Sequence, residues 1–475
     1  MFDVAVIGGG VIGGAILRKL SSYNLKICLL EKGNDVCVGQ SKANSGIVHA
    51  GFDASEGSLK AKFNLLGNLM MPKFAQELGV KYKNNGSLVV AFSDEEMQTL
   101  SNLKERGIKN GVQGLEIIDQ AKLRELEPNI SRRAIGALLA PTGGIMCPYE
   151  LTIATIGNAM DNGASLFTNF EVCKIEKGEN FEIVSTNGEK VCAKTIINCA
   201  GYGSQKVANA VGDYSFTIGG RRGEYILLDK ESGGFVNHTL FFTPTKMGKG
   251  ILISPTVDGN LLLGPTADEV EFNNTDTTQT GLQSVIGKAN EMCQGVPTYN
   301  AITSFAGVRA YCDRHDFIIE ESSAVKGFIN CVGIESPGLT SAPAIAEYVV
   351  DEILSKIITL TKNAQFNGIR RPDYFFNRLS VEEKNEIIKK DPSYGRIVCR
   401  CEKITEGEII RALTQNPKAT DLDGVKRRTR AGMGRCQGGF CQPYVADLIA
   451  KLNGVTLDKV TKNGKGSEIV VGETK

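Results

Sequence analysis

The sequence predicts an α/β protein with a Rossmann-like domain, an inserted and mainly antiparallel β-sheet, and a small cysteine-rich C-terminal domain. The N-terminal residues 1–31 have the pattern of a strand, a glycine-rich turn, a helix and a second strand. Residues 214–308 consist mostly of short strand and turn patterns. Two close pairs of cysteines follow residue 395. Together these observations favour an α/β nucleotide-binding fold with two additions.

Composition limits the function classes. The chain has 475 residues, enough for two or three domains, and its 42% hydrophobic and 23% charged residues are typical of globular proteins. A net charge of +1 predicts no general attraction to nucleic acid or to an anionic membrane. No apolar run is long enough to span a membrane, and a strand that begins at residue 2 leaves no room for a signal peptide. Thirteen cysteines, mostly within apolar strands, predict a reducing cytoplasm.

The first 31 residues form a βαβ pattern. Residues 2–7 are an apolar strand, residues 11–20 are helical, and residues 26–30 form a second strand that ends in Glu31. The intervening turn contains G-x-G-x-x-G, whose glycines are Gly8, Gly10 and Gly13. Such a turn lets a pyrophosphate approach the helix N-terminus, and Glu31 is placed to accept hydrogen bonds from a ribose.

This motif has a purely steric alternative, because glycine turns also occur without a ligand. The register of strand, helix, second strand and acidic residue favours a dinucleotide site over that alternative. The motif occurs once, so we expect NAD(H), if it is used, to bind a different polypeptide.

The remaining elements are predicted from periodicity and from turn residues. Expected helices cover residues 58–78, 94–110, 119–127, 150–162, 341–358 and 381–390. Expected strands cover residues 87–92, 134–140, 165–176, 181–186, 191–199, 223–228, 239–242, 250–254, 260–263 and 327–332. The strand at 191–199 enters the glycine turn at 200–203, which indicates a nucleotide domain assembled from separated segments.

These elements predict the domain limits. Residues 1–360 form the oxidoreductase domain, with nucleotide-binding segments at about 1–80, 145–215 and 325–360. The sheet that covers the ligand comprises about 80–145 and 215–325. A linker at 361–394, a cysteine domain at 395–455 and a tail at 456–475 complete the chain.

Taken together, these landmarks resemble the FAD-dependent oxidoreductases of the D-amino-acid-oxidase and glycerol-3-phosphate-dehydrogenase superfamily, over about residues 1–360. Besides the glycine motif, the matching stretches are A-N-S-G-I-V-H-A-G at 43–51, I-I-N-C-A-G-Y-G at 196–203, G-V-R-A at 307–310 and G-I-E-S-P-G-L-T-S-A-P-A-I-A at 333–346. The nearest branches are the large subunit of anaerobic glycerol-3-phosphate dehydrogenase and L-2-hydroxyglutarate dehydrogenase.

The resemblance implies an extended FAD site. The residues implied to hold FAD are Gly8, Gly10, Val11, Ile12, Gly13, Glu31, Lys32, Asn44, Ser45, Gly46, Val172, Ala200, Gly201, Gly333, Gly338, Leu339 and Thr340. Val172 would lie near the adenine, residues 44–46 would face the isoalloxazine, and residues 338–340 would meet its pyrimidine edge. The physical chemistry agrees, because a helix N-terminus stabilises the anion of a reduced flavin. The alternative is a helix start that binds no ligand.

Flavin-dependent oxidation of an alcohol needs a base and a cation for an anionic substrate. His49 lies in the loop of small residues and has an ordinary pKa near neutrality, which suits a base; alternatively it only hydrogen-bonds the flavin. Arg309 matches the superfamily arginine that binds the substrate anion. Arg222 and Tyr225 lie on the expected covering sheet and are candidates to complete the pocket, although surface salt bridging is the default expectation for both Arg221 and Arg222.

The sequence does not decide between the substrates of the two branches, glycerol 3-phosphate and L-2-hydroxyglutarate. Many glycerol-3-phosphate dehydrogenases carry H-G-G-L-R, whereas this chain has H-A-G-F-D at 49–53, which is closer to the hydroxyglutarate branch. The cysteine domain and the G-R-R-G-E-Y stretch favour oxidation of sn-glycerol 3-phosphate to dihydroxyacetone phosphate. An amino-acid or opine dehydrogenase is a weaker alternative, and a non-catalytic electron carrier is an alternative of another class.

The C-terminal cysteines are Cys399, Cys401, Cys436 and Cys441. Two close pairs in glycine-rich turns suit a tetrathiolate site, for which 2Fe–2S, zinc and unliganded thiols are alternatives. The C-x-C pair is unusual for zinc ribbons, and the domain resembles the bacterioferritin-associated-ferredoxin-like 2Fe–2S domains. That resemblance implies transfer of single electrons to a partner, such as an electron-transfer flavoprotein or an NAD-linked subunit. The basic stretch at 426–430 is either a solvated turn or a surface that steers an acidic partner.

Overall fold

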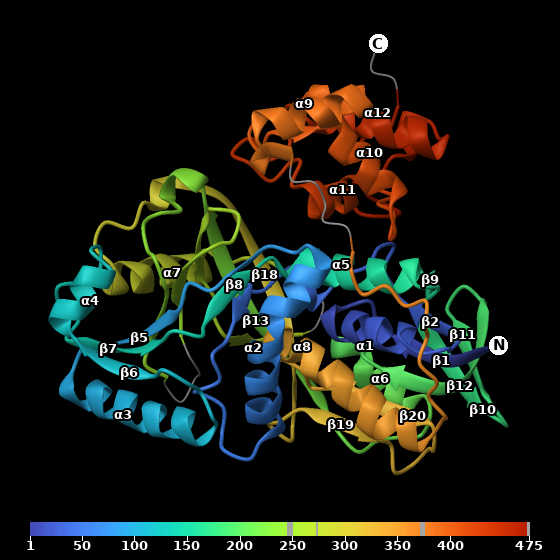
Figure 1. The fold of residues 1–475 in the computed structure, drawn as a ribbon, viewed down its shortest axis with the longest axis horizontal. Coiled ribbons are helices and arrows are strands. Elements are labelled where there is room, and N and C mark those ends of the chain that lie inside the picture. Colours follow the sequence, from blue (N-terminus) through green and yellow to red (C-terminus); the bar gives the residue numbers. More distant parts are fainter. Residues whose placement is uncertain (245–249, 272–273, 371–375, 473–475) are drawn as a thin grey trace.

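The computed structural model describes the whole chain except residues 245–249, 272–273, 371–375 and 473–475. Part of the predicted linker (371–375) and the end of the predicted tail (473–475) therefore lie outside the described residues. Figure 1 shows a nucleotide-binding body around β1 and β12, a second body beside it with α3, α4 and α7, and the helices α9–α12 above them, with α11 over α5.

The first sheet carries the Rossmann-like core. Its strands are β1 (Phe2–Ile7), β2 (Ile27–Leu30), β9 (Ser165–Phe167), β10 (Val172–Lys177), β11 (Phe181–Ser185), β12 (Lys190–Asn198), β19 (Ile318–Glu321) and β20 (Phe328–Val332). The strands β9, β2, β1, β12 and β20 are parallel in that order, and β19 pairs antiparallel with β20. The hairpin of β10 and β11 pairs with the first half of β12. The strand expected at 165–176 is therefore two strands.

Helices cover this sheet and join it to the second body. They are α1 (Val11–Ser21), α2 (Leu59–Leu78), α5 (Pro148–Asp161), α6 (Ser204–Asn209) and α8 (Gly338–Glu347). Gly67 allows α2 to lie against the start of α8, since a Cβ there would come within 2.0 Å of the Thr340 carbonyl oxygen. The helix expected at 341–358 begins earlier, at Gly338, and becomes a π-helix at Tyr348–Ile353.

The second sheet is mainly antiparallel and combines both inserted segments. Its strands are β5 (Ser87–Ala91), β6 (Glu116–Asp119), β7 (Gly136–Ala140), β13 (Ile218–Leu228), β14 (Thr239–Phe242), β15 (Leu252–Pro255), β16 (Leu261–Gly264), β17 (Asp268–Glu269) and β18 (Ala301–Cys312). One parallel pairing, between β5 and β14, joins the earlier segment to the later one.

Three helices and a small sheet complete this body. The helices are α3 (Asp94–Lys109), α4 (Gln120–Leu126) and α7 (Gln279–Met292). The small sheet contains β3 (Ile47–Val48), β4 (Tyr82–Lys83) and β8 (Gly144–Met146). The region of α7 was expected to be strand and turn, so this helix is a correction.

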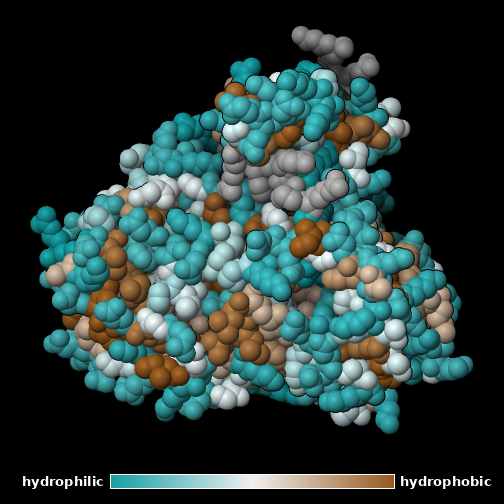
Figure 2. Space-filling view, in the orientation of Figure 1, coloured by the Kyte–Doolittle hydropathy of each residue, from teal (hydrophilic) through white to brown (hydrophobic). Residues whose placement is uncertain are grey.

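The C-terminal domain has its own apolar core. Its elements are α9 (Val381–Lys390), β21 (Ile397–Cys399), β22 (Ile404–Thr405), α10 (Glu406–Thr414), α11 (Leu422–Thr429) and α12 (Gln442–Asn453). Ile409, Val425 and Ile449 are fully or almost fully buried at its centre. On the face shown in Figure 2 the surface is largely hydrophilic, with scattered apolar patches. Among the described residues, no helix is long and apolar enough to cross a membrane.

Candidate active site

The glycine turn between β1 and α1 is built by close contacts. Gly8 has a φ of 112°, and a Cβ there would lie 2.4 Å from the Cys199 carbonyl oxygen at the end of β12. A Cβ at Gly13 would lie 2.0 Å from the Gly8 carbonyl oxygen, so helix and turn pack without room for a side chain. Gly8, Gly10, Val11 and Ile12 line a large cavity, whereas Gly13 shapes the turn behind it. This is the geometry in which a helix N-terminus accepts a pyrophosphate.

Glu31 lies at the end of β2 and faces this turn. Its Oε2 accepts from the Gly9 N–H at 2.6 Å and its Oε1 from the Gly33 N–H at 2.7 Å. Burial raises the pKa of Glu31, although these two backbone hydrogen bonds oppose the rise. Glu31 lines the cavity, so its remaining lone pairs are available to a ribose while its backbone contacts fix the loop.

The loop at 43–51 is held from both sides. Asn44 Oδ1 accepts from the Gly46 N–H at 2.9 Å, and Gly46 has a φ of 65° against β8. The His49 N–H donates to Thr340 Oγ1 at 2.9 Å, and its carbonyl accepts from Asn64 Nδ2, also at 2.9 Å. The backbone of His49 is therefore fixed between α8 and α2.

The His49 ring reaches the cavity. Its Nε2 lies 3.2 Å from Ser336 Oγ, and its ring centroid lies 6.0 Å from that of Phe241. Gly338 and Leu339, at the N-terminus of α8, line the same cavity, as do Asn44, Ser45 and Gly46. Thr340 does not face the cavity but pins the loop through its hydroxyl. A basic nitrogen and a positive helix end thus meet where the isoalloxazine was expected.

The cavity has a volume of about 990 Å³ and runs between the two sheets. The cavity is also lined by predicted cofactor residues that lie far apart in the sequence: Lys32, Val172, Ala200, Gly201 and Gly333. Lys32 donates to the Tyr202 hydroxyl at 2.8 Å. The cavity is thus continuous from the adenosine end, near Val172, to the His49 end.

The covering sheet contributes a polar wall. Tyr225 on β13 lies opposite Phe305 on β18, and their rings stack with centroids 4.8 Å apart. The Tyr225 hydroxyl lies 3.3 Å from Ser45 Oγ, which links the sheet to the loop. Burial raises the pKa of Tyr225, and Arg309 partly offsets this. Tyr225 therefore stays neutral and is available as a hydrogen-bond donor.

Two arginines face the cavity from adjacent strands. Arg309 on β18 lies directly opposite Arg221 on β13, and both line the cavity. Arg309 donates to the Thr266 carbonyl at 2.9 Å, while its buried Nε has no hydrogen-bond partner among the described residues. Arg221 pairs with Glu269 at 3.1 Å. Glu269 offsets the charge of Arg221, whereas the unpartnered Nε of Arg309 leaves hydrogen-bonding capacity in the cavity wall.

Arg222 is placed differently from the sequence expectation. It is not among the described residues that line the cavity. Successive strand residues point to opposite faces, so Arg222 shares a face with Glu224 and pairs with it at 3.0 Å. Glu224 in turn accepts from the Thr278 N–H at the start of α7. Arg222 therefore supports α7, and Arg221 takes the position in the cavity that was expected for Arg222.

The four C-terminal cysteines come together as two pairs. Cys401 Sγ and Cys436 Sγ lie 3.6 Å apart, and the Cys399 and Cys441 thiols hydrogen-bond each other. That contact lowers the pKa of Cys399, and the backbone N–H groups of Gly432 and Glu402 add to the effect. Two pairs of thiolates that receive backbone hydrogen bonds fit the two irons of a 2Fe–2S cluster.

The basic stretch at 426–430 fits neither sequence interpretation. Arg427 and Arg428 both pair with Asp35 at 2.7 Å, and each has only 6% of its side chain exposed. Arg430 pairs with Asp258 and Glu402, both at 2.8 Å. These side chains are buried against other parts of the same chain, so they form neither a solvated turn nor a surface for an external partner.

Sequence reasoning missed several residues that shape the site. Gln40 accepts from the Ala310 N–H at 3.1 Å and donates to the Ile334 carbonyl at 3.2 Å, which ties β18 to the loop before α8. Lys60 lines the cavity and pairs with Glu335 at 2.9 Å. Arg221, for which a surface salt bridge was the default expectation, pairs with Glu269 and also lines the cavity. Its placement depends on strand register, for which the sequence carried no signal.

Comparison with known proteins supports both halves of this site. A family model described as FAD dependent oxidoreductase matches residues 3–352, and one described as BFD-like 2Fe–2S binding domain matches residues 397–451. The second match favours iron and sulfide over zinc at the four cysteines. The predicted fold class and both predicted cofactors are confirmed by these matches.

Two dehydrogenases of known name are similar to this chain in sequence. A glycerol 3-phosphate dehydrogenase of Caloramator mitchellensis is 49% identical over 476 residues, covering 100% of this chain and 99% of that protein. An L-2-hydroxyglutarate dehydrogenase of Escherichia coli (strain K12) is 33% identical over 273 residues, covering 56% of this chain and 64% of that protein.

A solved structure of an FAD-bound enzyme has a similar fold. The dithionite-reduced L-alpha-glycerophosphate oxidase of Mycoplasma pneumoniae with FAD bound superimposes with a TM-score of 0.74 at 31% identity. The match covers 78% of this chain and 98% of the oxidase. This chain is an enzyme of the FAD-dependent oxidoreductase family, and it carries a C-terminal BFD-like domain for a 2Fe–2S cluster.

Proposed function

We propose that this enzyme oxidises sn-glycerol 3-phosphate to dihydroxyacetone phosphate, with FAD as the first electron acceptor and the 2Fe–2S cluster as the second. The observation that carries the proposal is the cross-strand pair of Arg221 and Arg309 in the cavity wall. Two guanidinium groups suit a phosphate dianion better than a single carboxylate. The full-length match to a protein named glycerol 3-phosphate dehydrogenase supports the same substrate.

His49 is the proposed base. Its imidazole is placed to receive the proton of the substrate hydroxyl. When bound, FAD would supply the acceptor for the hydride that leaves the carbon bearing this hydroxyl. The backbone of His49 is fixed by Thr340 and Asn64, which orients the ring toward the cavity. Ser336 lies 3.2 Å from Nε2 and is placed to hold that nitrogen in position. Orientation of this kind contributes to the rate without new binding energy.

The covering sheet positions the substrate. The Tyr225 hydroxyl borders the loop through Ser45, and the arginine pair lies farther along the same two strands. A phosphate held by the arginines therefore anchors one end of the substrate, and the hydroxyl-bearing carbon extends toward His49. The N-terminus of α8 offers positive charge at the ring edge.

The electron count requires an external acceptor. Oxidation of the alcohol releases two electrons and two protons, and a 2Fe–2S cluster carries one electron at a time. Two single-electron steps through the cluster would reoxidise the flavin. We propose that the electrons leave to a redox protein that accepts one electron at a time. The C-terminal cysteine domain supports this route, since a simple oxidase has no need of it.

A 2-hydroxy acid such as L-2-hydroxyglutarate is the second candidate. The H-A-G-F-D run at 49–53 favours it, because no arginine follows the loop histidine. Anaerobic mixing with each substrate separates the two proposals. We expect sn-glycerol 3-phosphate to bleach the oxidised flavin far faster than L-2-hydroxyglutarate, and the reverse order would replace the first proposal with the second.

A further inference from the structure

Arg430 lies at the junction of the cysteine domain and the flavin-binding body. It caps the C-terminus of α11 in a left-handed conformation with a φ of 72°, and only 9% of its side chain is exposed. An arginine in this backbone conformation is uncommon, and its side chain is directed into a buried polar interface. Neither the family match nor the proposed chemistry assigns a role to it.

The guanidinium of Arg430 joins three separate parts of the chain. Its Nε donates to Glu402 Oε2 at 2.8 Å, and Glu402 directly follows the cluster ligand Cys401. Its Nη1 donates to Asp258 Oδ2 at 2.8 Å and to the Tyr149 hydroxyl at 3.2 Å. Asp258 follows a strand of the covering sheet, and Tyr149 lies in the first turn of α5. One side chain therefore bridges the cluster loop, the sheet and the flavin-binding body.

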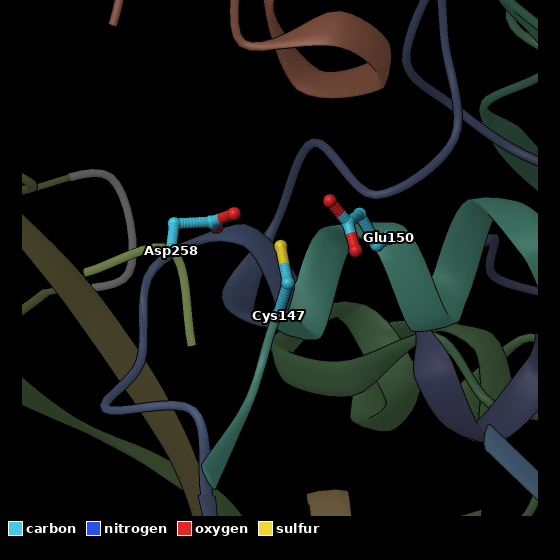
Figure 3. A group of neighbouring side chains, drawn as sticks. All are labelled: Cys147, Glu150 and Asp258. Carbon is cyan, nitrogen blue, oxygen red and sulfur yellow. The ribbon is translucent and has the colours of Figure 1, made fainter. Parts of the chain in front are cut away.

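The acidic side of this junction is an ion cluster. Figure 3 shows Cys147 between Glu150 on α5 and Asp258 on the facing loop. These donor types resemble a metal site, but Lys81 pairs with both Glu150, at 3.2 Å, and Asp258. Arg430 supplies a second cation to Asp258. Lys81 and Arg430 therefore already supply the positive charge that a metal ion would bring. The carboxylate of Asp258 balances the charge of Arg430.

This junction is directly connected to the flavin loop. The Met146 N–H donates to the Gly46 carbonyl at 2.8 Å, and a Cβ at Gly46 would lie 2.4 Å from the Met146 carbonyl oxygen. Tyr149, the partner of Arg430, is three residues beyond Met146. On the other side, Gly432, two residues beyond Arg430, hydrogen-bonds the Cys399 sulfur through its N–H. Arg430 therefore lies between the support of the flavin loop and a cluster ligand.

We propose that Arg430 is a positioning residue that holds the cluster loop against the flavin-binding body and so fixes the flavin-to-cluster separation. This rests on the proposed transfer of single electrons from reduced FAD to the cluster. The rate of such transfer falls steeply with distance, so a loose junction would slow it. Reduction of the flavin by substrate does not cross the junction, and the Met146–Gly46 backbone contact that supports the flavin loop does not involve Arg430, so we expect this step to be unaffected.

The test uses the full chain loaded with FAD and cluster. Arg430→Met removes the positive charge and the several N–H donors of the guanidinium. Arg430→Lys keeps the charge and restores part of the contact with Glu402 and Asp258. Tyr149→Phe is a milder variant that removes one hydroxyl and is expected to fold. Arg396→Met is the matched control, since Arg396 is 62% exposed and pairs with Glu406 inside the cysteine domain. Hydrogen exchange and anaerobic rapid-freeze EPR are measured on each.

In Arg430→Met we expect amide exchange at residues 256–260 and 399–402 to quicken by about tenfold or more, because a buried ion pair has lost a partner. We expect cluster reduction to slow by about tenfold or more, while substrate bleaches the flavin at the wild-type rate. Arg430→Lys recovers part of both losses, Tyr149→Phe shows smaller losses, and Arg396→Met shows none.

The two hypotheses fail in different ways. If exchange at both segments is unchanged in Arg430→Met and Tyr149→Phe, Arg430 does not hold the junction and the inference is overturned. If exchange quickens but cluster reduction keeps its wild-type rate, the junction does not set the separation, which also overturns it. If the wild-type cluster stays oxidised while substrate bleaches the flavin, the proposed electron route is itself wrong, and with it the role of Arg430 in electron transfer.

Discussion

Arg221 and Arg309 lie directly opposite each other on antiparallel strands, and both side chains line the cavity. The residue next to Arg221 on the same strand, Arg222, lies on the other face and pairs with the fully buried Glu224. Two adjacent arginines thus lie in two different environments, and the difference between them is set by the alternation of the strand.

Replacing these neighbours should separate binding from stability. Arg221→Met should raise the KM for glycerol 3-phosphate by about ten- to a hundredfold, the value of one hydrogen-bonded charge, with little change in Tm. Arg222→Met should leave KM unchanged but lower the unfolding free energy by about 3–5 kcal/mol, because Glu224 loses its buried partner. Steady-state kinetics and thermal unfolding measure both. A rise in KM in the Arg222 variant alone would reverse the assignment.

His49→Asn should lower the rate of flavin reduction by about a hundredfold or more, the usual contribution of a general base. Asparagine keeps a hydrogen-bonding side chain but cannot take the proton, so FAD content and substrate affinity should persist. Anaerobic stopped-flow mixing gives the rate, and the absorbance of the purified protein gives the FAD content. A variant that reduces its flavin within a few-fold of the wild-type rate would mean that His49 only contacts the flavin.

Cys436→Ser should remove the EPR signal of the reduced cluster and the reduction of a one-electron acceptor protein. Flavin reduction by substrate should be unchanged, since the cavity is built from other residues. Cys173→Ser is the matched control, because Cys173 is an exposed free cysteine on β10 in the nucleotide-binding body. Equal loss of both activities in Cys436→Ser would indicate that the cluster is structural and carries no electrons.

Asp35→Asn should weaken the chain in a pH-dependent way. Burial raises the pKa of Asp35, but Arg428 and Arg427 outweigh this and hold it below the ordinary value. A lowered folded-state pKa stabilises the fold above the ordinary Asp pKa of about 3.9, and that stability is lost as pH falls through the folded-state value. The urea midpoint of Asp35→Asn should therefore lie below wild type at pH 7 and approach it in acid. A gap that widens in acid would contradict this assignment.

The sequence was sufficient to predict the parts of the site that depend on local chemistry. Residue type, spacing and the family resemblance singled out the glycine turn, Glu31, the loop of His49 and the four cysteines, and the structure places the first three at the cavity and brings the cysteines together. Their roles toward FAD, substrate and cluster stay predictions. The parts of the site that depend on strand register could not be predicted from the sequence. The strand was expected to begin at residue 223, but β13 begins at Ile218, and its pairing with β18 decides which arginine faces the cavity.

Two further differences have other causes. The helix α7 has a helical period of buried Val285, Ala289 and Met292 and a Thr278 N-cap, so a signal was present in a region judged to be sheet. The basic stretch at 426–430 carried no comparable signal. Its partners Asp35 and Asp258 both lie in the oxidoreductase domain, far away in the sequence, and only tertiary structure brings them to the basic stretch. The basic stretch therefore forms part of the buried contact between the cysteine domain and the oxidoreductase domain.

The central claim is that the cavity takes a phosphorylated secondary alcohol and passes its electrons to FAD. The most direct measurement is anaerobic mixing of the purified protein with sn-glycerol 3-phosphate while the absorbance of oxidised flavin is followed. The account predicts rapid bleaching with dihydroxyacetone phosphate as product, and much slower bleaching with L-2-hydroxyglutarate. A flavin that stays oxidised with glycerol 3-phosphate, or that is bleached faster by the hydroxy acid, would contradict it.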